Sequence, residues 1–161
     1  MSLYCAIGSE TTELSATDLK QALFQAFAAL GDRRSVLALP PDFTRFHSRA
    51  GDVTRIAWEC CGERLKCVMP ALGTHVPMTA GEISTMFGDM PGGLFRVHDW
   101  RSDLATLGEV PAQFVSEQSE GKLDYAWPAQ VNRILVDGWF DLILSICQVV
   151  PHEVIGMANY N

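Results

Sequence analysis

The chain has 161 residues, a length that suits one domain with a sizeable core, and it carries a formal net charge of −7. With 48% hydrophobic and 19% charged residues it has the composition of a soluble globular protein, and its apolar runs are too short to cross a bilayer. The charge argues against nucleic acid and anionic membranes as partners, because these bind clustered Lys and Arg, although a few arginines could still hold a small anion.

The five cysteines indicate a reduced setting. Their number is odd and they form no C-x-x-C pair, and Cys67 and Cys147 lie in apolar runs where a free thiol behaves as a small hydrophobic group. The N-terminal "MSLYCAIGSE" lacks the basic stretch and apolar core of a signal peptide. We therefore expect a cytoplasmic protein with free thiols rather than a disulfide or zinc framework.

Helical and strand patterns alternate along the chain. The run "SATDLKQALFQAFAAL" has helical spacing, with Ser15 or Thr17 as the cap and Gly31 as the stop. "AGDVTRIAWECCGE" is a second helix, and a third begins after Thr79, where Glu82 completes a capping-box pattern. Strands are predicted at 35–39, 66–70, 94–98 and 141–149.

Two further segments are less regular. "AQFV" is interpreted as a short additional strand. "PAQVNRILVDG" fits a helix that begins at Pro128, but its β-branched residues also allow a strand. The alternation as a whole predicts an α/β fold, a single Rossmann-like three-layer domain over residues 1–161 with helices on both faces of a mostly parallel sheet.

Polar residues follow the predicted strands, which is where ligands bind in such sheets. In the first junction, "PPDFTRFHSR", Arg45 could grip a carboxylate or phosphate and Asp42 could accept from a hydroxyl or orient the guanidinium, with Thr44 between them. The alternative is an ordinary turn with an Asp cap and an exposed ion pair. The short motif alone leaves both readings open.

The second and third junctions each hold a histidine beside a proline. In "ALGTHVPMT", His75 lies between Gly73 and Pro77, which restrict the backbone, and in "CQVVPHEVIG", His152 follows Pro151. A histidine can exchange a proton near neutral pH, so the two are candidate acid/base groups, whereas either alone could be structural.

The remaining histidines are interpreted as non-catalytic. His98 lies in "RVHDWRSD", where Asp99 or Ser102 is expected to cap the next turn, and His47 is expected to be exposed. A metal site built from His75, His98 and His152 has no recognised ligand spacing, so we predict no metal ligands in this chain.

Four motifs in order, "DFTR", "ALGTHVPMT", "VHDWRSDLATLG" and "VVPHEVIG", resemble the N-terminal domain of the lactate racemase family. The resemblance covers the chain from about Val36 to its end. It implies a two-domain α/β enzyme acting on 2-hydroxy acids with a nickel-pincer nucleotide, a racemase or epimerase. It also implies that Asp42, Thr44 and Arg45 bind the cofactor, that Arg45 also binds substrate, and that His75 and His152 form the acid/base pair.

The sequence departs from the family pattern at two places, Phe46 in place of a proline and the ending "GMANYN", which indicates a divergent branch. The lysine that tethers the cofactor is expected beyond Asn161, together with a C-terminal domain. We therefore expect this chain to be the N-terminal part of a longer enzyme, inactive alone and without bound cofactor. An exposed apolar patch is expected where the missing domain docks, or where two copies associate.

The implied chemistry accounts for these residues. Hydride transfer from a 2-hydroxy acid requires a base on each side of the reacting carbon and a cation for the carboxylate, which His75, His152 and Arg45 would supply. A dinucleotide-dependent oxidoreductase is disfavoured, because "VLALPPDFTR" has no glycine-rich turn. The alternative from another class is a non-catalytic module that binds a small anion or a protein.

Overall fold

The computed structural model describes residues 3–152 and 156–157. By their internal contacts the residues fall into two units, the first made of Met1–Val97 with Phe140–Asn161 and the second of His98–Trp139. The predicted single α/β domain over residues 1–161 therefore stays a prediction.

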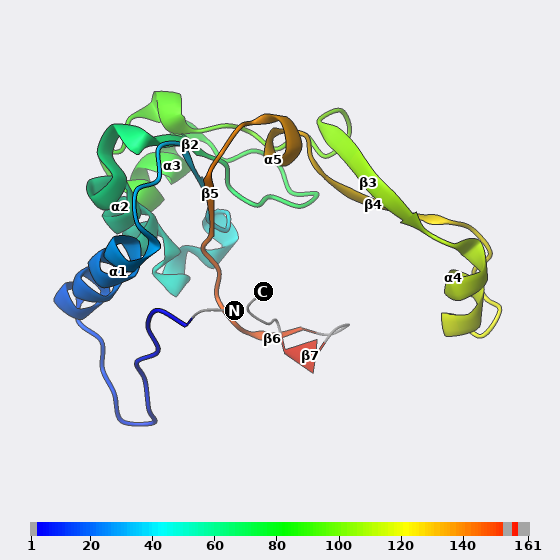
Figure 1. Ribbon diagram of the computed structural model, residues 1–161, viewed down its shortest axis with the longest axis horizontal. Helices are drawn as coiled ribbons and strands as arrows, with labels where there is room; N and C mark the ends of the chain where they lie inside the picture. Colours follow the sequence, from blue (N-terminus) through cyan, green and yellow to red (C-terminus); the bar gives the residue numbers. More distant parts are fainter. Residues whose placement is uncertain (1–2, 153–155, 158–161) are drawn as a thin grey trace. The chain divides into compact units, whose positions relative to one another are not determined.

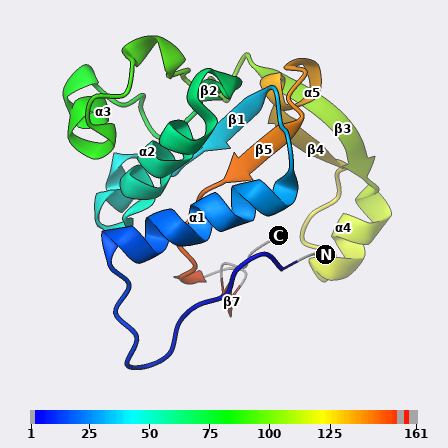
Figure 2. The ribbon, with the colours of Figure 1, turned by 60° about the vertical axis from the view of Figure 1, so that its left-hand side comes forward.

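The first unit is built on a parallel sheet of three strands, ordered β2–β1–β5; Figure 1 labels β2 and β5, and Figure 2 also labels β1. These are β1 (Val36–Leu39), β2 (Leu65–Val68) and β5 (Leu142–Ser145). The central strand β1 is almost fully buried, which explains why its sequence, "VLAL", is apolar at every position. Its neighbours pair with it on both sides, so the loop after β1 lies at a point where the strand order changes direction.

Three α-helices belong to the same unit: α1 (Ala16–Leu30), α2 (Ala50–Cys61) and α3 (Ala80–Phe87). Figure 2 shows α1 and α2 packed against each other in front of the strands. Both α1 and α3 begin with the capping boxes that the sequence predicts, Ser15 with Asp18 and Thr79 with Glu82. Short 3₁₀ turns follow at η1 (Phe43–Ser48), η2 (Gly62–Arg64) and η3 (Gly92–Leu94).

The core lies between the helices and one face of the sheet. Strand residues Val36, Ala38 and Val68 meet Met86 and Phe87 of α3, and all five are at least 95% buried. Helix α1 contributes no fully buried residue, so α2 and α3 form the main cover.

Helices α2 and α3 approach each other closely at one glycine. A Cβ atom at Gly51 would lie 2.1 Å from the carbonyl oxygen of Met86. That distance is far inside van der Waals contact, so only glycine allows this approach. Gly81 has the same position in α3, second in the helix after an alanine, but a Cβ there would meet nothing closer than 4.0 Å.

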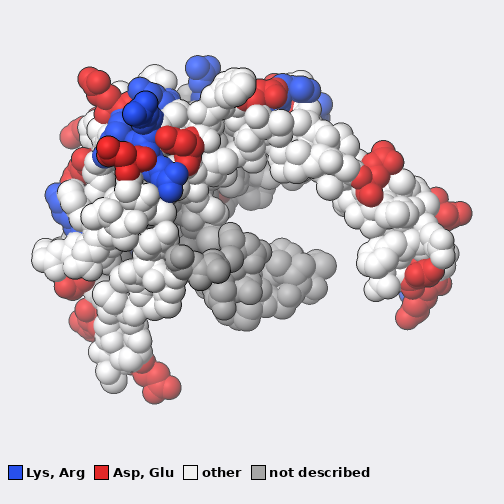
Figure 3. All heavy atoms as spheres, viewed as in Figure 1, with Lys and Arg blue, Asp and Glu red and all other residues white. Residues whose placement is uncertain are grey.

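Charged side chains lie on the surface of this unit, and several are paired across it. Figure 3 shows Lys and Arg beside Asp and Glu on the face it presents. Lys20 of α1 contacts Glu59 of α2 at 2.6 Å, and Asp52 accepts from both Arg49 and Arg55. Because these pairs are exposed to solvent, each stabilises the fold by only about 0–1 kcal/mol.

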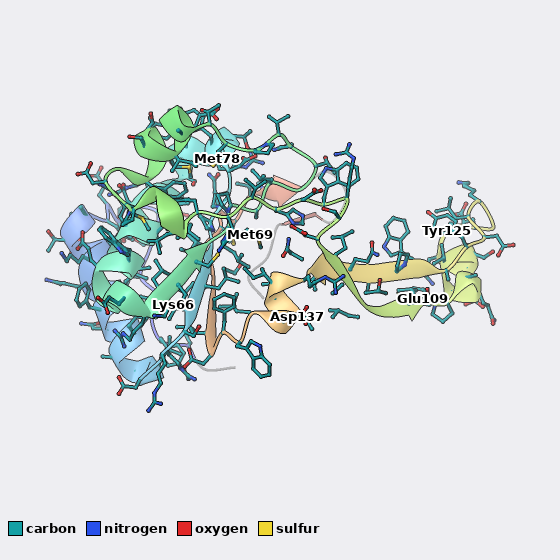
Figure 4. All side chains as sticks on the ribbon, turned by 90° about the horizontal axis from the view of Figure 1, so that it is seen from above. Lys66, Met69, Met78, Glu109, Tyr125 and Asp137 are labelled. Atoms are coloured by element: carbon teal, nitrogen blue, oxygen red, sulfur yellow. The ribbon has the colours of Figure 1, made fainter. Side chains whose placement is uncertain are left out.

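The second unit is an antiparallel ribbon of β3 (Leu104–Val110) and β4 (Trp127–Asn132), with the helices α4 (Ala112–Gln118) and α5 (Ile134–Asp137). The register shifts between Thr106 and Gly108, which marks a bulge in β3. At the α4 end of the ribbon, where Figure 4 labels Glu109 and Tyr125, the ring of Tyr125 stacks on Trp127 with centroids 5.9 Å apart.

Three sequence-based expectations differ from the structure. The expected strand at 94–98 is reduced to one bridge between Val68 and Phe95, because the preceding Pro91-Gly92-Gly93 enters a 3₁₀ turn. "AQFV" is helical in α4, since Pro111 precedes it and Gln and Glu extend it. The strand expected at 141–149 ends at Ser145.

The ambiguous segment "PAQVNRILVDG" contains both structures, with the strand β4 first and the turn of helix α5 after it. The antiparallel ribbon was not expected as such. Near the chain's end, β6 (Pro151–His152) pairs with β7 (Gly156–Met157) in a short antiparallel hairpin. The predicted α/β class, with a mostly parallel sheet flanked by helices, is confirmed. Within the described ranges, no helix has the length and apolar character needed to span a membrane.

Candidate functional site

The candidate site lies where β1 and β2 end. Parallel pairing continues beyond both strands, because Ala71 donates to the carbonyl of Pro40 at 2.8 Å and Pro41 bridges Ala71. This extended pairing holds the loop after β1 beside the loop after β2. As a result, the D-x-T-R segment and the G-T-H segment, far apart in sequence, meet at the carboxyl edge of the sheet.

The central contact is between His75 and Asp42. The ring Nδ1 of His75 lies 2.6 Å from Oδ2 of Asp42. Asp42 is only 6% exposed, whereas the side chain of His75 is 58% exposed. Because a carboxylate can only accept, Nδ1 carries the proton of this hydrogen bond. Within the described ranges no hydrogen bond occupies Nε2, so this nitrogen is the one left for proton exchange.

Thr44 fixes the other carboxylate oxygen. Its backbone N–H donates to Oδ1 of Asp42 at 3.0 Å, and its hydroxyl donates to the same oxygen. Asp42 thus has two functions: Oδ1 caps the N-terminus of η1, and Oδ2 contacts His75. Burial acts to raise the pKa of Asp42, but the hydrogen bonds from Thr44 and His75 outweigh it and leave that pKa below its ordinary value.

The sequence around His75 explains its placement. Gly73 has a φ of +56°, a conformation that favours glycine, and it lets the chain turn directly after β2. The amide of His75 then donates to the carbonyl of Leu72 at 3.0 Å, which closes the turn. Pro77 follows and limits the backbone before α3. These are the constraints that the sequence predicts for "ALGTHVPMT".

A pocket of about 350 Å³ opens beside this pair. Its walls come from η1, from the loop that contains Met78 (labelled in Figure 4), and from the first turn of α3. The lining residues are Asp42, Phe43, Thr44, His75, Val76, Pro77, Met78 and Glu82. Its volume falls in the ordinary range of roughly 300–1,000 Å³ for small-ligand sites. Among these lining residues the charged side chains are carboxylates, with no Lys or Arg.

A larger hollow of about 760 Å³ lies elsewhere on the first unit, beside Trp58, Leu65 and Leu94. Its lining includes Glu59, Glu63 and Lys66 but no histidine and no thiol. The larger volume of this hollow therefore does not identify it as the functional site. The smaller pocket is the better candidate, because a carboxylate orients a histidine at its edge.

Of the other two sequence-predicted residues, Arg45 does not line this pocket, and His152 cannot be compared with it because its side chain is not described. Arg45 lies in η1 and its amide donates to the carbonyl of Asp42 at 3.0 Å, but its side chain is exposed and does not line the pocket. The backbone of His152 belongs to the β6–β7 hairpin, and its side chain lies outside the described part of the structure. The pairing of His75 with His152 stays a prediction.

The expected turn cap at Asp99 and the expected exposure of His47 are confirmed, whereas the non-catalytic interpretation of His98 and His47 stays a prediction. Asn132 donates to Nδ1 of His98 at 2.8 Å, and Asp99 accepts from the amides of Arg101 and Ser102 as a turn cap. His47 is exposed. Across residues 3–152 and 156–157, no group of three or more His, Cys, Asp or Glu side chains could hold a metal ion.

Sequence reasoning missed one member of the pocket. Glu82 was recognised only as part of the capping box of α3, yet it also lines the pocket with His75. The signal was present in "THVPMTAGE", since the turn after His75 runs directly into the cap. A short connection of this kind keeps the first helical turn close to the strand end.

Comparison with known proteins gives two solved structures. A structural-genomics protein of Thermotoga maritima matches with 33% identity and a TM-score of 0.73 over 87% of this chain and 35% of its own. The lactate racemase apoprotein of Thermoanaerobacterium thermosaccharolyticum matches with 17% identity and a TM-score of 0.51 over 83% of this chain and 28% of its own. No family model matches, and no curated protein does.

The second match shows that this chain shares the fold of part of lactate racemase. The chain spans about a third of the length of each of these two proteins.

Proposed function

We propose that this chain is the N-terminal, cofactor- and substrate-binding domain of a longer lactate-racemase-like enzyme that inverts or oxidises a 2-hydroxy acid. In this enzyme His75 exchanges a proton with the substrate hydroxyl. The observation that carries the proposal is the 2.6 Å contact by which buried Asp42 holds the exposed ring of His75 at the edge of a pocket. The shared fold with lactate racemase supports it.

Thr44, Asp42 and His75 have separate roles in this proposal. Thr44 holds Oδ1 of Asp42, so that Oδ2 is left to fix the ring of His75 through Nδ1. The ring then has its Nε2 lone pair available to accept the hydroxyl proton of the substrate. Once the ring is protonated, the Asp42 carboxylate lies next to the positive charge. A carboxylate that orients a base in this way is a common device of proton-transfer sites.

Arg45 and His152 complete the proposal. Arg45 would hold the substrate carboxylate through its planar fork, which requires its exposed side chain to turn toward the pocket. His152 would return a proton on the opposite face of the substrate carbon. Its support is its position after β5 and the resemblance of "VVPHEVIG" to the family motif.

The described residues of the pocket do not fit a nickel-pincer nucleotide on their own. An anionic nucleotide needs cationic or amide donors, whereas the charged groups of this lining, apart from His75, are the carboxylates of Asp42 and Glu82. No cluster of metal ligands occurs in the described ranges. The cofactor would have to be held mainly by residues outside this pocket. The steps above concern the hydroxyl proton alone, and the hydride of the substrate carbon needs an acceptor that these residues do not supply.

The same charges bear on the alternative function, a module that binds a small anion or a protein without turnover. The two carboxylates in the lining oppose any bound anion, a 2-hydroxy acid included, so anion binding in either function requires the Arg45 side chain to turn toward the pocket. A protein-binding module would need the Asp42–His75 contact only for structure. The enzyme should therefore lose turnover when the imidazole of His75 is removed, whereas a binding module has no turnover to lose.

The test uses the protein expressed from its complete gene. Inversion of lactate, glycerate and malate would be followed by chiral chromatography, and metal and mass analysis would detect nickel and a covalent adduct. We expect turnover of at least one of these acids, and we expect His75→Ala to lower kcat by roughly 10²–10⁴-fold. His47→Ala, an exposed histidine outside the pocket, should leave kcat unchanged. Near-normal turnover in His75→Ala would overturn the proposal.

A further inference from the structure

Glu82 is held rigidly at the wall of the candidate pocket. Its Oε2 accepts from the amide of Thr79 at 2.7 Å and from the hydroxyl of Thr79 at 2.9 Å. In return, the Thr79 hydroxyl accepts from the amide of Glu82 at 3.2 Å. The capping box therefore fixes the side chain of Glu82 as well as the start of α3.

This engagement leaves the second oxygen of Glu82 available. Within the described ranges, the hydrogen bonds of its carboxylate are made by Oε2, and Glu82 lines the same pocket as Asp42 and His75. The lining also contains the apolar residues Phe43, Val76, Pro77 and Met78. A ligand whose hydroxyl meets His75 thus has a fixed acceptor within the same pocket.

We infer that Glu82 determines substrate specificity at this site: it favours 2-hydroxy acids whose far end donates a hydrogen bond and disfavours those with a second carboxylate. The inference rests on the proposed function and deepens it. A pre-positioned acceptor binds a hydroxyl group without a cost in side-chain ordering, whereas a second carboxylate would face Glu82 and Asp42 without a cation in the described lining.

Three acids that differ only in the group on the reacting carbon probe this directly. Glycerate carries a hydroxymethyl group, lactate a methyl group and malate a carboxymethyl group. For the protein from the complete gene, we expect affinity and kcat/KM to fall in the order glycerate, lactate, malate. Affinities would be measured by calorimetry, so that the readout does not depend on turnover.

Glu82→Gln is the decisive variant, because glutamine can still complete a capping box but carries no charge. We expect the affinity for malate relative to lactate to rise about tenfold, the order of magnitude that removing one like charge at a partly exposed site produces. Asp18→Asn is the matched control. It changes the same capping position in α1, away from the pocket, and should leave the preference unchanged.

A second variant guards against a folding defect in Glu82→Gln. Val76→Lys adds a cation at an exposed lining position without touching the capping box, and it should also raise the malate-to-lactate ratio. An unchanged ratio in both variants would overturn the inference, even if His75→Ala abolishes turnover. Conversely, a shifted ratio together with normal turnover in His75→Ala would refute the proposed proton transfer and leave the role of Glu82 in ligand selection intact.

Discussion

The imidazole of His75 and the carboxylate of Asp42 lie 2.6 Å apart, although 33 positions separate them in the chain. They meet because each follows one of two adjacent parallel strands, and because the pairing of β1 with β2 continues into both loops. The contact therefore depends on the register of the sheet. A change that shifts β1 against β2 would separate the two groups without altering either residue.

Asp42→Asn should change how stability responds to acid. The pKa of Asp42 is lowered in the folded protein, so its ionised form stabilises the fold above the unfolded pKa of about 3.9, and this stabilisation is lost as the pH falls through the lower folded value. Free energies of unfolding from urea titrations should differ between wild type and variant by a constant amount above about pH 5. The difference should shrink below about pH 4. Parallel pH profiles would contradict the expectation.

Thr44→Val should raise the pKa of Asp42, because it removes the hydroxyl that donates to Oδ1 while keeping the branched shape. Carboxyl NMR titration would show a midpoint at higher pH than in wild type. Thr44→Ser retains a hydroxyl and should restore the wild-type midpoint. Equal midpoints in Thr44→Val and wild type would mean that this hydroxyl has no influence on Asp42.

Arg45→Lys should weaken substrate binding more than it slows the chemical step, since lysine cannot reproduce a bidentate grip on a carboxylate. In the complete enzyme we expect a higher KM, by roughly tenfold, with kcat changed less. Arg34→Lys is a matched control, because Arg34 precedes β1 at the opposite end of the strand. If both variants bind substrate as wild type does, Arg45 has no part in recognition.

Gly51→Ala should destabilise the first unit by about 1–3 kcal/mol, because its methyl group would overlap the carbonyl of Met86. Gly81→Ala is the natural comparison, with the same helical position and open space around it. It should leave the protein as stable as wild type or stabilise it by up to about 1 kcal/mol, since alanine favours helix. Thermal or urea unfolding measures both, and similar effects would rule out close packing at Gly51.

The helices and the central strands were predictable because their signals are local. Ser15 and Thr79 cap the helices that the sequence assigns to them, and "VLAL" is buried on all sides as its uniform apolar character indicates. The position of His75 was also readable, because Gly73 and Pro77 restrict the chain on both sides. Local backbone constraints of this kind do not depend on contacts with the rest of the chain.

The misplaced segments have different causes, one distant in sequence and one local. The run at 94–98 is apolar enough for a strand, but only Phe95 finds a bridge, on Val68. "AQFV" alternates too briefly to separate strand from helix, and Pro111 decides the matter by opening α4. Within the site, the exposed position of Arg45 follows from the direction of η1, which the motif itself does not encode.

In sequence the second unit lies between β2 and β5, the two strands that flank β1, and this has a consequence for synthesis on the ribosome. β1 and β2 emerge early, but the other edge of β1 is completed only by β5, which begins at Leu142; Asp141 then accepts from the amides of Arg34 and Ser35 at 2.7 and 2.9 Å. Until Ser145 has emerged, one edge of β1 presents unpaired backbone N–H and C=O groups beside apolar side chains. A nascent chain halted after Val97 would thus be prone to pair with strands of other molecules, a hazard that the arrival of β5 removes.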